Sequence, residues 1–323
     1  MRKLLAILML LSMLIPGVIA EETIDIPEAV PANITPLPMD LSAGYVPNPD
    51  CYIEADEANG ILQGYQDESL TVTMERVKVG DSTFNVARIK IADPSQLRTG
   101  LENEKASRNN KVSAIAAKHN AVVAIGGDFF ADAKNGYIVR QYKEFRKSPK
   151  SVYDMLLIDN NGDFHIVMRS DAEELKALLA SETLTFPNIF NFGPATIVDG
   201  VLQEVPQYYI DNGNKYNIKS TSEPRCAIGQ LGPLEYMLVA SYGNQTKGNK
   251  GMTIYEFAQV CEQAGRALNP ENGCLLAFNL DGGNSTTLNF KGMRNNKFTY
   301  VKVNCPDIER QVSDIIYFAT LVK

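Results

Sequence analysis

The sequence of 323 residues predicts an α+β fold in which a strand-rich mixed sheet core is flanked by a few helices. Three observations predict it. Short runs of alternating apolar and polar residues, bounded by turn residues, recur along the chain. Strand signals outnumber helix signals, and the helices do not alternate with strands as in a regular βαβ fold. No internal repeat is visible, so a single domain is expected.

The first 20 residues have the pattern of a secretory signal peptide. Arg2 and Lys3 form a basic start, residues 4–15 are apolar, and residues 18–20 (V-I-A) provide a small-residue cleavage site. The apolar run is too short to favour a membrane span, and no second candidate follows it. We therefore expect a secreted or cell-surface protein with no transmembrane segment after cleavage.

Residues 21–60 are expected to form a proline-rich leader or linker. Their first part lacks apolar periodicity, which is typical of an extended spacer. The prolines are Pro27, Pro31, Pro36, Pro38, Pro47 and Pro49. The folded domain is therefore predicted to span residues 61–323.

Composition limits the partners and the chemistry. The chain is acidic, with a net charge of −7, which disfavours nucleic acid as a partner because nucleic-acid binding needs basic surface. Its only histidines, His119 and His165, argue against a histidine-rich zinc site. A metal site would be rich in oxygen ligands and would favour calcium or magnesium. The five cysteines do not reveal which of them pair, and an odd count leaves at least one free thiol or an intermolecular bridge. The oligomeric state stays open.

Two strand pairs are predicted before residue 170. Residues 70–79 and 84–91 alternate apolar and polar side chains on either side of Gly80-Asp81. Residues 155–158 and 164–168 flank an Asn-Asn-Gly turn, which is typical of a hairpin. A further strand is expected at residues 234–241.

Two short helices are predicted in the first two thirds of the chain. Residues 112–119 follow Asn109 and Asn110, either of which can cap a helix. Residues 170–173 (S-D-A-E) resemble a capping box that starts a helix through Leu179.

A longer helix is predicted over residues 254–264. Thr253 and Glu256 form a capping box at its start, and apolar residues recur at helical spacing along it. Gly265 is expected to end it.

The helix leads into residues 274–287 (C-L-L-A-F-N-L-D-G-G-N-S-T-T). As a strand, this run would point Leu276, Phe278 and Leu280 to one face and carry Asn279 and Asp281 on the other. Gly282 and Gly283 follow, and they allow backbone angles that other residues avoid. Ser285, Thr286 and Thr287 add hydroxyl groups. The run is therefore either an ordinary Asp-Gly turn or the edge of a site.

A second apolar strand runs into glycines and an aspartate at residues 121–130 (A-V-V-A-I-G-G-D-F-F). Asp128 and Phe130 share a face if the strand persists. Finding two such strand ends in one domain favours their convergence. Two other positions stand out: Gly193-Pro194 stiffens a loop, and Arg225 precedes an apolar strand with a side chain suited to phosphate.

Taken together, six motifs resemble the phosphodiester glycosidase family. Each is weak alone, but all occur in the family's order, and with an upstream segment at residues 87–98 the resemblance covers residues 84–322. The motifs lie at residues 124–130, 192–200, 224–229, 251–258, 279–287 and 309–316. The resemblance implies a single catalytic domain that hydrolyses the glycosidic bond of a sugar-1-phosphodiester, similar to a GlcNAc-1-phosphodiester, in a cell-envelope polymer or exopolysaccharide.

The resemblance also implies roles for particular residues. Asp281 and Asp128 would form the catalytic acid pair, and Arg225 would bind the phosphate. No cofactor is required, although Asp128 and Asp281 could hold a calcium or magnesium ion. The substrate-binding residues would be Asn279, Gly282, Gly283, Ser285, Thr286, Gly193 and Phe130.

Two alternatives stay open. Gly126, Cys226 and Asn284 stand where the family usually has Asn, Thr and Gly, and the first and last of these favour a non-catalytic exported module that binds a cell-envelope polysaccharide or teichoic-acid-like polymer. A serine hydrolase built on Ser285 is the least favoured, because no histidine lies in any of the six motifs.

Overall fold

The structure is a computed structural model. It describes residues 34–56, 58, 61–79, 82–129, 136–148, 153–205, 208–211, 214–217, 221–243, 249–304 and 309–323. The predicted signal peptide, Phe130 and Cys305 lie outside these residues. No helix among those described is long and apolar enough to cross a membrane.

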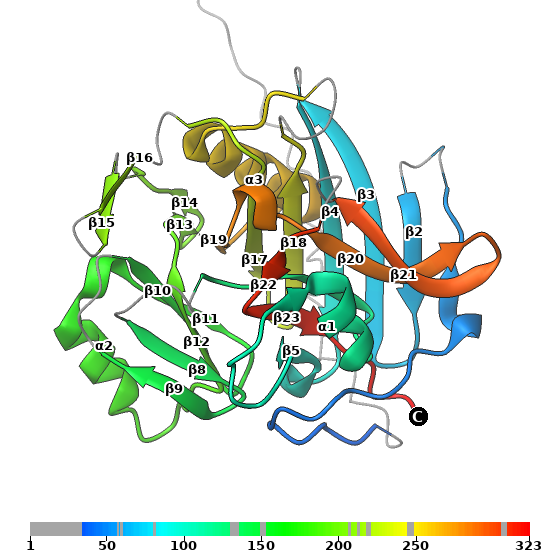
Figure 1. Cartoon of the computed structure of the whole chain (residues 1–323), viewed down its shortest axis with the longest axis horizontal. Coiled ribbons are helices and arrows are strands. Elements are labelled where there is room, and N and C mark those ends of the chain that lie inside the picture. Colours follow the sequence, from blue (N-terminus) through cyan, green and yellow to red (C-terminus); the bar gives the residue numbers. More distant parts are fainter. Residues whose placement is uncertain are drawn as a thin grey trace, which may run out of the picture.

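Three large sheets form the molecule (Figure 1). The nine-stranded sheet has the order β1-β2-β3-β4-β18-β17-β19-β13-β14. The β7 sheet has the order β21-β20-β7-β23-β5, and the β12 sheet, green in Figure 1, has the order β11-β10-β12-β8-β9. The predicted strand-rich α+β fold is confirmed, and the strand pairings among the described residues are antiparallel.

The strand bounds follow the sheets. The nine-stranded sheet consists of β1 (Tyr52–Ile53), β2 (Ile61–Gln66), β3 (Leu70–Val79), β4 (Ser82–Ile91), β18 (Glu235–Ser241), β17 (Cys226–Gly232), β19 (Leu276–Asn279), β13 (Ala195–Val198) and β14 (Val201–Leu202). The β7 sheet consists of β21 (Lys297–Asn304), β20 (Leu288–Arg294), β7 (Val123–Gly126), β23 (Asp314–Phe318) and β5 (Leu97–Leu101). The β12 sheet consists of β11 (Phe164–Val167), β10 (Asp154–Ile158), β12 (Asn188–Phe192), β8 (Tyr137–Arg140) and β9 (Lys143–Lys147). Two small pairs are β15 (Tyr208–Asp211) with β16 (Asn214–Asn217) and β22 (Gln311–Val312) with β6 (Asn110–Lys111).

Three α-helices cover these sheets. They are α1 (Val112–Lys118), α2 (Ala172–Leu179) and α3 (Ile254–Leu268). Helix α1 packs on β7 and β23, whereas α3 packs on β13, β17 and β18 of the nine-stranded sheet. Short 3-10 turns are η1 (Pro49–Cys51), η3 (Pro94–Gln96), η4 (Met168–Ser170) and η5 (Gly283–Ser285).

The helix starts differ in detail from the predicted caps. Asp171, rather than Ser170, caps α2 by accepting hydrogen bonds from two N–H groups of the first turn. Helix α1 has no side-chain cap from its own N-cap residue, Lys111. Instead the carboxylate of Glu309 accepts hydrogen bonds from the N–H and hydroxyl of Ser113, both at 2.7 Å. A cap supplied from a distant residue leaves no local sequence signal.

One apolar core joins the three large sheets. The predicted alternation along β19 places Leu276 and Phe278, with Leu280 beyond the strand, in this core, while Ala277 faces the cluster under α3. The opposite face of β19 is therefore free to carry Asn279 toward its end.

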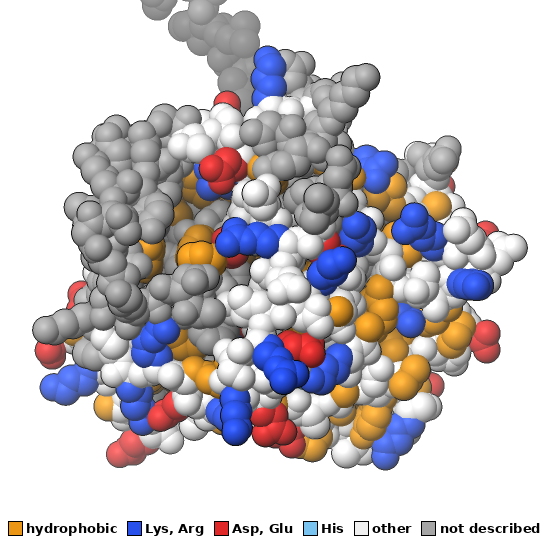
Figure 2. Space-filling model, in the orientation of Figure 1, with side chains coloured by type: hydrophobic (Ala, Val, Ile, Leu, Met, Phe, Trp, Pro, Cys, Tyr) orange, Lys and Arg blue, Asp and Glu red, His pale blue; other side chains and the backbone are white. Residues whose placement is uncertain are grey.

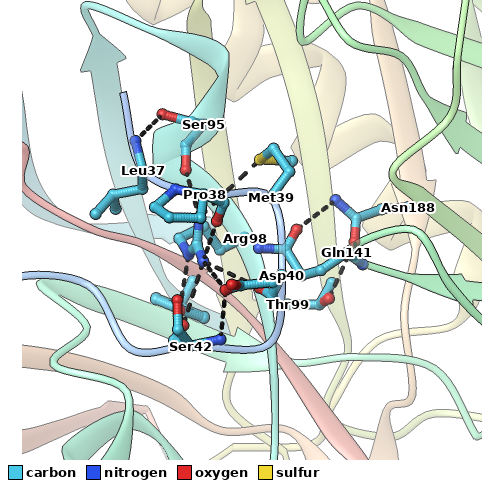
Figure 3. A network of polar contacts seen from close by, with 11 residues as sticks. Leu37, Pro38, Met39, Asp40, Ser42, Ser95, Arg98, Thr99, Gln141 and Asn188 are labelled. Carbon is cyan, nitrogen blue, oxygen red and sulfur yellow. Dashed lines mark hydrogen bonds and ion pairs between the residues drawn. The ribbon is translucent and has the colours of Figure 1, made fainter. Parts of the chain in front are cut away.

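The amino-terminal part of the described chain is fastened by Arg98 (Figure 3). The guanidinium of Arg98, in β5, is fully buried, and its Nη2 donates to the carbonyls of Pro38 at 2.9 Å, Asp40 at 3.0 Å and Ser42 at 3.2 Å. Its Nε donates to the hydroxyl of Tyr317 at 3.1 Å. We call residues 37–42 the N-terminal strap. The strap lies in the predicted leader, so this part of that segment packs onto the domain.

Helix α3 does not end at Gly265 as predicted but continues to Leu268. A Cβ on Gly265 would lie 2.4 Å from the Cβ of Cys274 and 2.6 Å from its backbone nitrogen. Gly265 therefore permits the close approach of the chain that enters β19, and the helix passes through it.

Gly265→Val should destabilise the protein by about 1–3 kcal/mol, because the new side chain overpacks the contact with Cys274. Denaturant unfolding measures this free energy. Gly232→Val is the matched control, since a Cβ there would meet nothing within 4 Å. Equal stability of the two variants would contradict the packing role of Gly265.

Candidate functional site

The candidate site lies where the three large sheets meet, at the ends of their strands. Asp128 follows β7, Arg225 directly precedes β17, and Asp281 follows β19. Arg140 closes β8 of the β12 sheet, and Asp314 opens β23.

Backbone hydrogen bonds bring the three predicted site segments together. The N–H of Asp281 donates to the carbonyl of Gly127 at 3.0 Å. The N–H groups of Leu280 and Gly283 donate to the carbonyls of Cys226 at 2.8 Å and Pro224 at 2.7 Å. Residues far apart in the sequence, Asp128, Arg225 and Asp281, are therefore neighbours.

The turn after Asp281 requires both of its glycines. A Cβ on Gly282 would lie 2.9 Å from the carbonyl oxygen of Pro224. Gly283 has a φ of +58°, and a Cβ there would lie 2.9 Å from Oε2 of Glu223. The turn is thus enclosed by the segment that carries Glu223 and Arg225.

Most N–H groups of this turn are already used inside the protein. Besides Gly283, the N–H groups of Ser285 and Thr286 donate to the carbonyls of Gly282 at 3.1 Å and Gly283 at 3.2 Å. These N–H groups are therefore not available to bind an anion. The buried hydroxyl of Ser285, in contrast, has no hydrogen-bond partner among the described residues.

A guanidinium not singled out by the sequence organises the acids. Arg140 is fully buried, with Nη2 2.8 Å from Oδ1 of Asp128 and Nε 2.6 Å from Oδ2 of Asp314. Its guanidinium carbon lies 4.0 Å above the ring centre of Phe190. The second oxygen of Asp128 accepts the N–H of Asn191 at 2.9 Å. Asp128 is thus fixed in place by two elements of the β12 sheet.

Asp314 is a fully buried acid of this group. Burial raises the pKa of its carboxyl to about 7, with Asp128 and Asp281 adding to the rise and Arg140 opposing it. Its Oδ1 accepts no hydrogen bond from the described residues. A Cβ on Gly127 would lie 2.4 Å from this oxygen, so Asp314 packs directly against the backbone that receives Asp281.

Arg225 is held by backbone carbonyls. It is 8% exposed, with Nε donating to Met252 at 3.1 Å and Nη2 donating to Thr221 at 2.6 Å. Burial lowers the pKa of its guanidinium, which the nearby Glu223 opposes. Its Nη1 has no acceptor among the described residues, so this nitrogen is the donor left for an anion.

The structure also locates other residues that the sequence singled out. Asn279 donates from Nδ2 to the carbonyl of Gly193 at 2.8 Å, which places these two residues together. Thr286 is buried beside Ser285, and Phe130 lies outside the described residues. Both histidines are hydrogen-bonded elsewhere, His119 to Leu101 and His165 to Asp159. Neither offers Ser285 a base.

Asp128 is poorly placed to hold a metal ion. A metal there would compete with Arg140 for Oδ1 and with the Asn191 N–H for Oδ2. Among the described residues, no group of three or more His, Cys, Asp or Glu side chains is arranged to bind an ion.

The family model described as phosphodiester glycosidase matches residues 119–319. The chain belongs to this family. The match includes every residue of the site described above. No protein with a curated description matches the sequence.

Three solved structures are similar to this member of the phosphodiester glycosidase family. The catalytic domain of zebrafish N-acetylglucosamine-1-phosphodiester alpha-N-acetylglucosaminidase, auto-inhibited by its pro-peptide, aligns over 87% of each chain with a TM-score of 0.54 and 13% identity. A hypothetical protein from Synechocystis aligns over 80% of this chain and 63% of its own, with a TM-score of 0.49 and 18% identity. A putative exported protein from Burkholderia pseudomallei aligns over 74% of each chain, with a TM-score of 0.43 and 15% identity.

Asp314→Asn should flatten the pH dependence of stability. The folded carboxyl titrates near pH 7, and an unfolded Asp titrates near about 3.9. Between these values the folded state holds a proton that the unfolded state releases, so the contribution of Asp314 to stability is full at low pH and is lost as the pH rises through 7.

Denaturant unfolding between pH 4 and 8 measures this effect. The wild type should lose up to about 1.4 kcal/mol per pH unit from this group, and Asp314→Asn should lack that slope. The exposed Glu271→Gln is the control. An unchanged slope in Asp314→Asn would contradict the assignment.

Proposed function

We propose that the protein is a secreted hydrolase that cleaves the glycosidic bond of a sugar-1-phosphodiester in a cell-envelope polymer or exopolysaccharide. One observation carries the proposal: the turn that follows Asp281 is enclosed by the segment that carries Glu223 and Arg225, so acidic residues and a guanidinium border the same turn. Family membership supports the reaction class.

The leaving group explains why a cation matters here. When the anomeric C–O bond breaks, its electron pair goes to a phosphate monoester whose second pKa is about 6. Such a group leaves as an anion and needs little protonation. The protein must instead hold the phosphate and stabilise the positive charge that develops on the sugar.

The residues divide these tasks. Asp281, which is partly exposed, faces the developing positive charge, and Nη1 of Arg225 binds the phosphate. Asp128, which is held by Arg140, is the second acid of the pair and contributes its negative charge to the site. The unpaired hydroxyl of Ser285 is the polar group proposed to contact a substrate oxygen. Asn279, Thr286, Gly282, Gly283, Gly193 and Phe130 are proposed to shape the surrounding site.

The second candidate is a module that binds the same class of polymer without cleaving it. The burial of Asp128 favours it, because both oxygens of that carboxylate are engaged inside the protein. Charges of both signs are mixed over the described part of the face in Figure 2, and no continuous basic surface covers it. Retention on the polymer without product would favour this candidate.

Asp281→Asn should abolish turnover. The substrate is a methyl phosphodiester of α-GlcNAc-1-phosphate, and release of reducing sugar measures the reaction. Loss of the charge facing the anomeric carbon should lower kcat by about 10²-fold or more. Asp199→Asn, on an exposed turn, is the matched control. Wild-type turnover in a folded Asp281→Asn protein would remove Asp281 from the mechanism.

Removal of divalent ions should leave turnover intact, because the Asp128 oxygens are engaged by Arg140 and Asn191. The rate is compared before and after dialysis against a chelator, and again after calcium or magnesium is added. A loss that either ion restores would contradict this expectation and place a metal in the reaction.

A further inference from the structure

The geometry leaves one part of the proposed reaction unassigned. A water that attacks the anomeric carbon must lose a proton, and Asp128 is not free to take it. That side chain is 2% exposed, and its two oxygens bind Arg140 and the N–H of Asn191. Because the proposed mechanism assigns Asp281 to the positive charge on the sugar, we look for the proton acceptor among the other carboxylates beside its turn.

Glu223 meets this requirement. Its Oε2 lies 2.9 Å from the position that a Cβ of Gly283 would take, so its carboxylate rests on the same turn as Asp281. The Cα atoms of Asp281 and Gly283 are at most about 7.6 Å apart, so both acids border the same turn. Arg225 contacts the neighbouring Gly282 through Cδ, at 3.7 Å from the equivalent Cβ position.

The main chain of Glu223 is fixed by hydrogen bonds, whereas its carboxylate acts on Arg225 only through its charge. Its N–H donates to the carbonyl of Met252 at 3.1 Å, and the N–H of Met252 donates back at 2.9 Å. The side chain is partly exposed and makes no hydrogen bond or ion pair with the described residues. A fixed backbone with a carboxylate that no described residue hydrogen-bonds suits a group that exchanges protons with water.

We propose that Glu223 is the general base of the reaction, which rests on the proposed function. Its carboxylate takes one proton from the attacking water, whose oxygen forms the new bond to the anomeric carbon. The C–O bond to phosphate breaks, and its electron pair leaves with the phosphate monoester. The proton then returns to solvent, so the enzyme is unchanged after each turnover.

The test replaces Glu223 with glutamine, which keeps the shape and cannot accept the proton. The kcat of Glu223→Gln should fall by about 10²–10⁴-fold, the typical contribution of general base catalysis, with KM within about twofold of the wild type. Glu271→Gln, exposed and remote in the sequence, should retain wild-type kcat.

Azide provides an independent readout. It attacks carbon without losing a proton, so it should restore the turnover of Glu223→Gln and yield a glycosyl azide with release of the phosphate monoester. Asp281→Asn should not be rescued in this way. Glu223→Asp, which keeps a carboxylate on a shorter stem, should retain more activity than Glu223→Gln and checks against a folding defect.

The outcomes separate this inference from the proposed function. A Glu223→Gln protein with wild-type kcat would overturn the role of Glu223. If Asp281→Asn is inactive in the same assay, the proposed function still stands. A loss that appears only in KM would also overturn it. If the wild type releases no sugar, the proposed function itself fails.

Discussion

The ion pairs of Arg140 are the interaction on which the rest of the site depends. A guanidinium without solvent contact is costly unless its donors are satisfied, and here they reach two aspartates of the β7 sheet and carbonyls of the β12 sheet. The sheets are therefore tied at one point. The carboxylate of Asp314 packs on Gly127, whose carbonyl accepts a hydrogen bond from the N–H of Asp281. The position of Asp281 therefore depends on this contact.

The charged groups of the site consequently separate into two sets. Arg140, Asp128 and Asp314 are buried and mutually paired, which suits them to holding geometry. Asp281 and Glu223 are partly exposed and stand on the glycine turn. Arg225 is intermediate between the two sets. Its Nε and Nη2 donate to backbone carbonyls, whereas its Nη1 has no acceptor among the described residues. The proposed chemistry uses the second set.

Local pattern predicted much of the fold. Alternation identified β3, β4 and the face of β19 that enters the core, because strand side chains alternate whatever the partner strand is. The capping box of Thr253 fixed the start of α3. The two glycine–aspartate strand ends indicated segments that the structure brings together. The signal peptide stays a prediction, since residues 1–33 lie outside the described chain.

What sequence could not supply was pairing between distant residues. Arg140 ends an ordinary strand, and Asp314 opens another, so nothing local marks either as a partner of Asp128. Gly265 looks like a helix terminator until the approach of Cys274 is known. Glu223 is a single acidic residue that precedes Pro224, and its local sequence does not mark it. Only its proximity to Gly283 distinguishes it.

The strap has a consequence for where the mature protein can start. Three carbonyl groups from residues 38–42 accept hydrogen bonds from Nη2 of the buried Arg98 guanidinium. Removal of the chain up to residue 42 would leave the buried Arg98 guanidinium without these three hydrogen-bond acceptors. The buried Arg98 thus limits how far the amino-terminal end can be shortened. The predicted cleavage after Ala20 would keep all three acceptors.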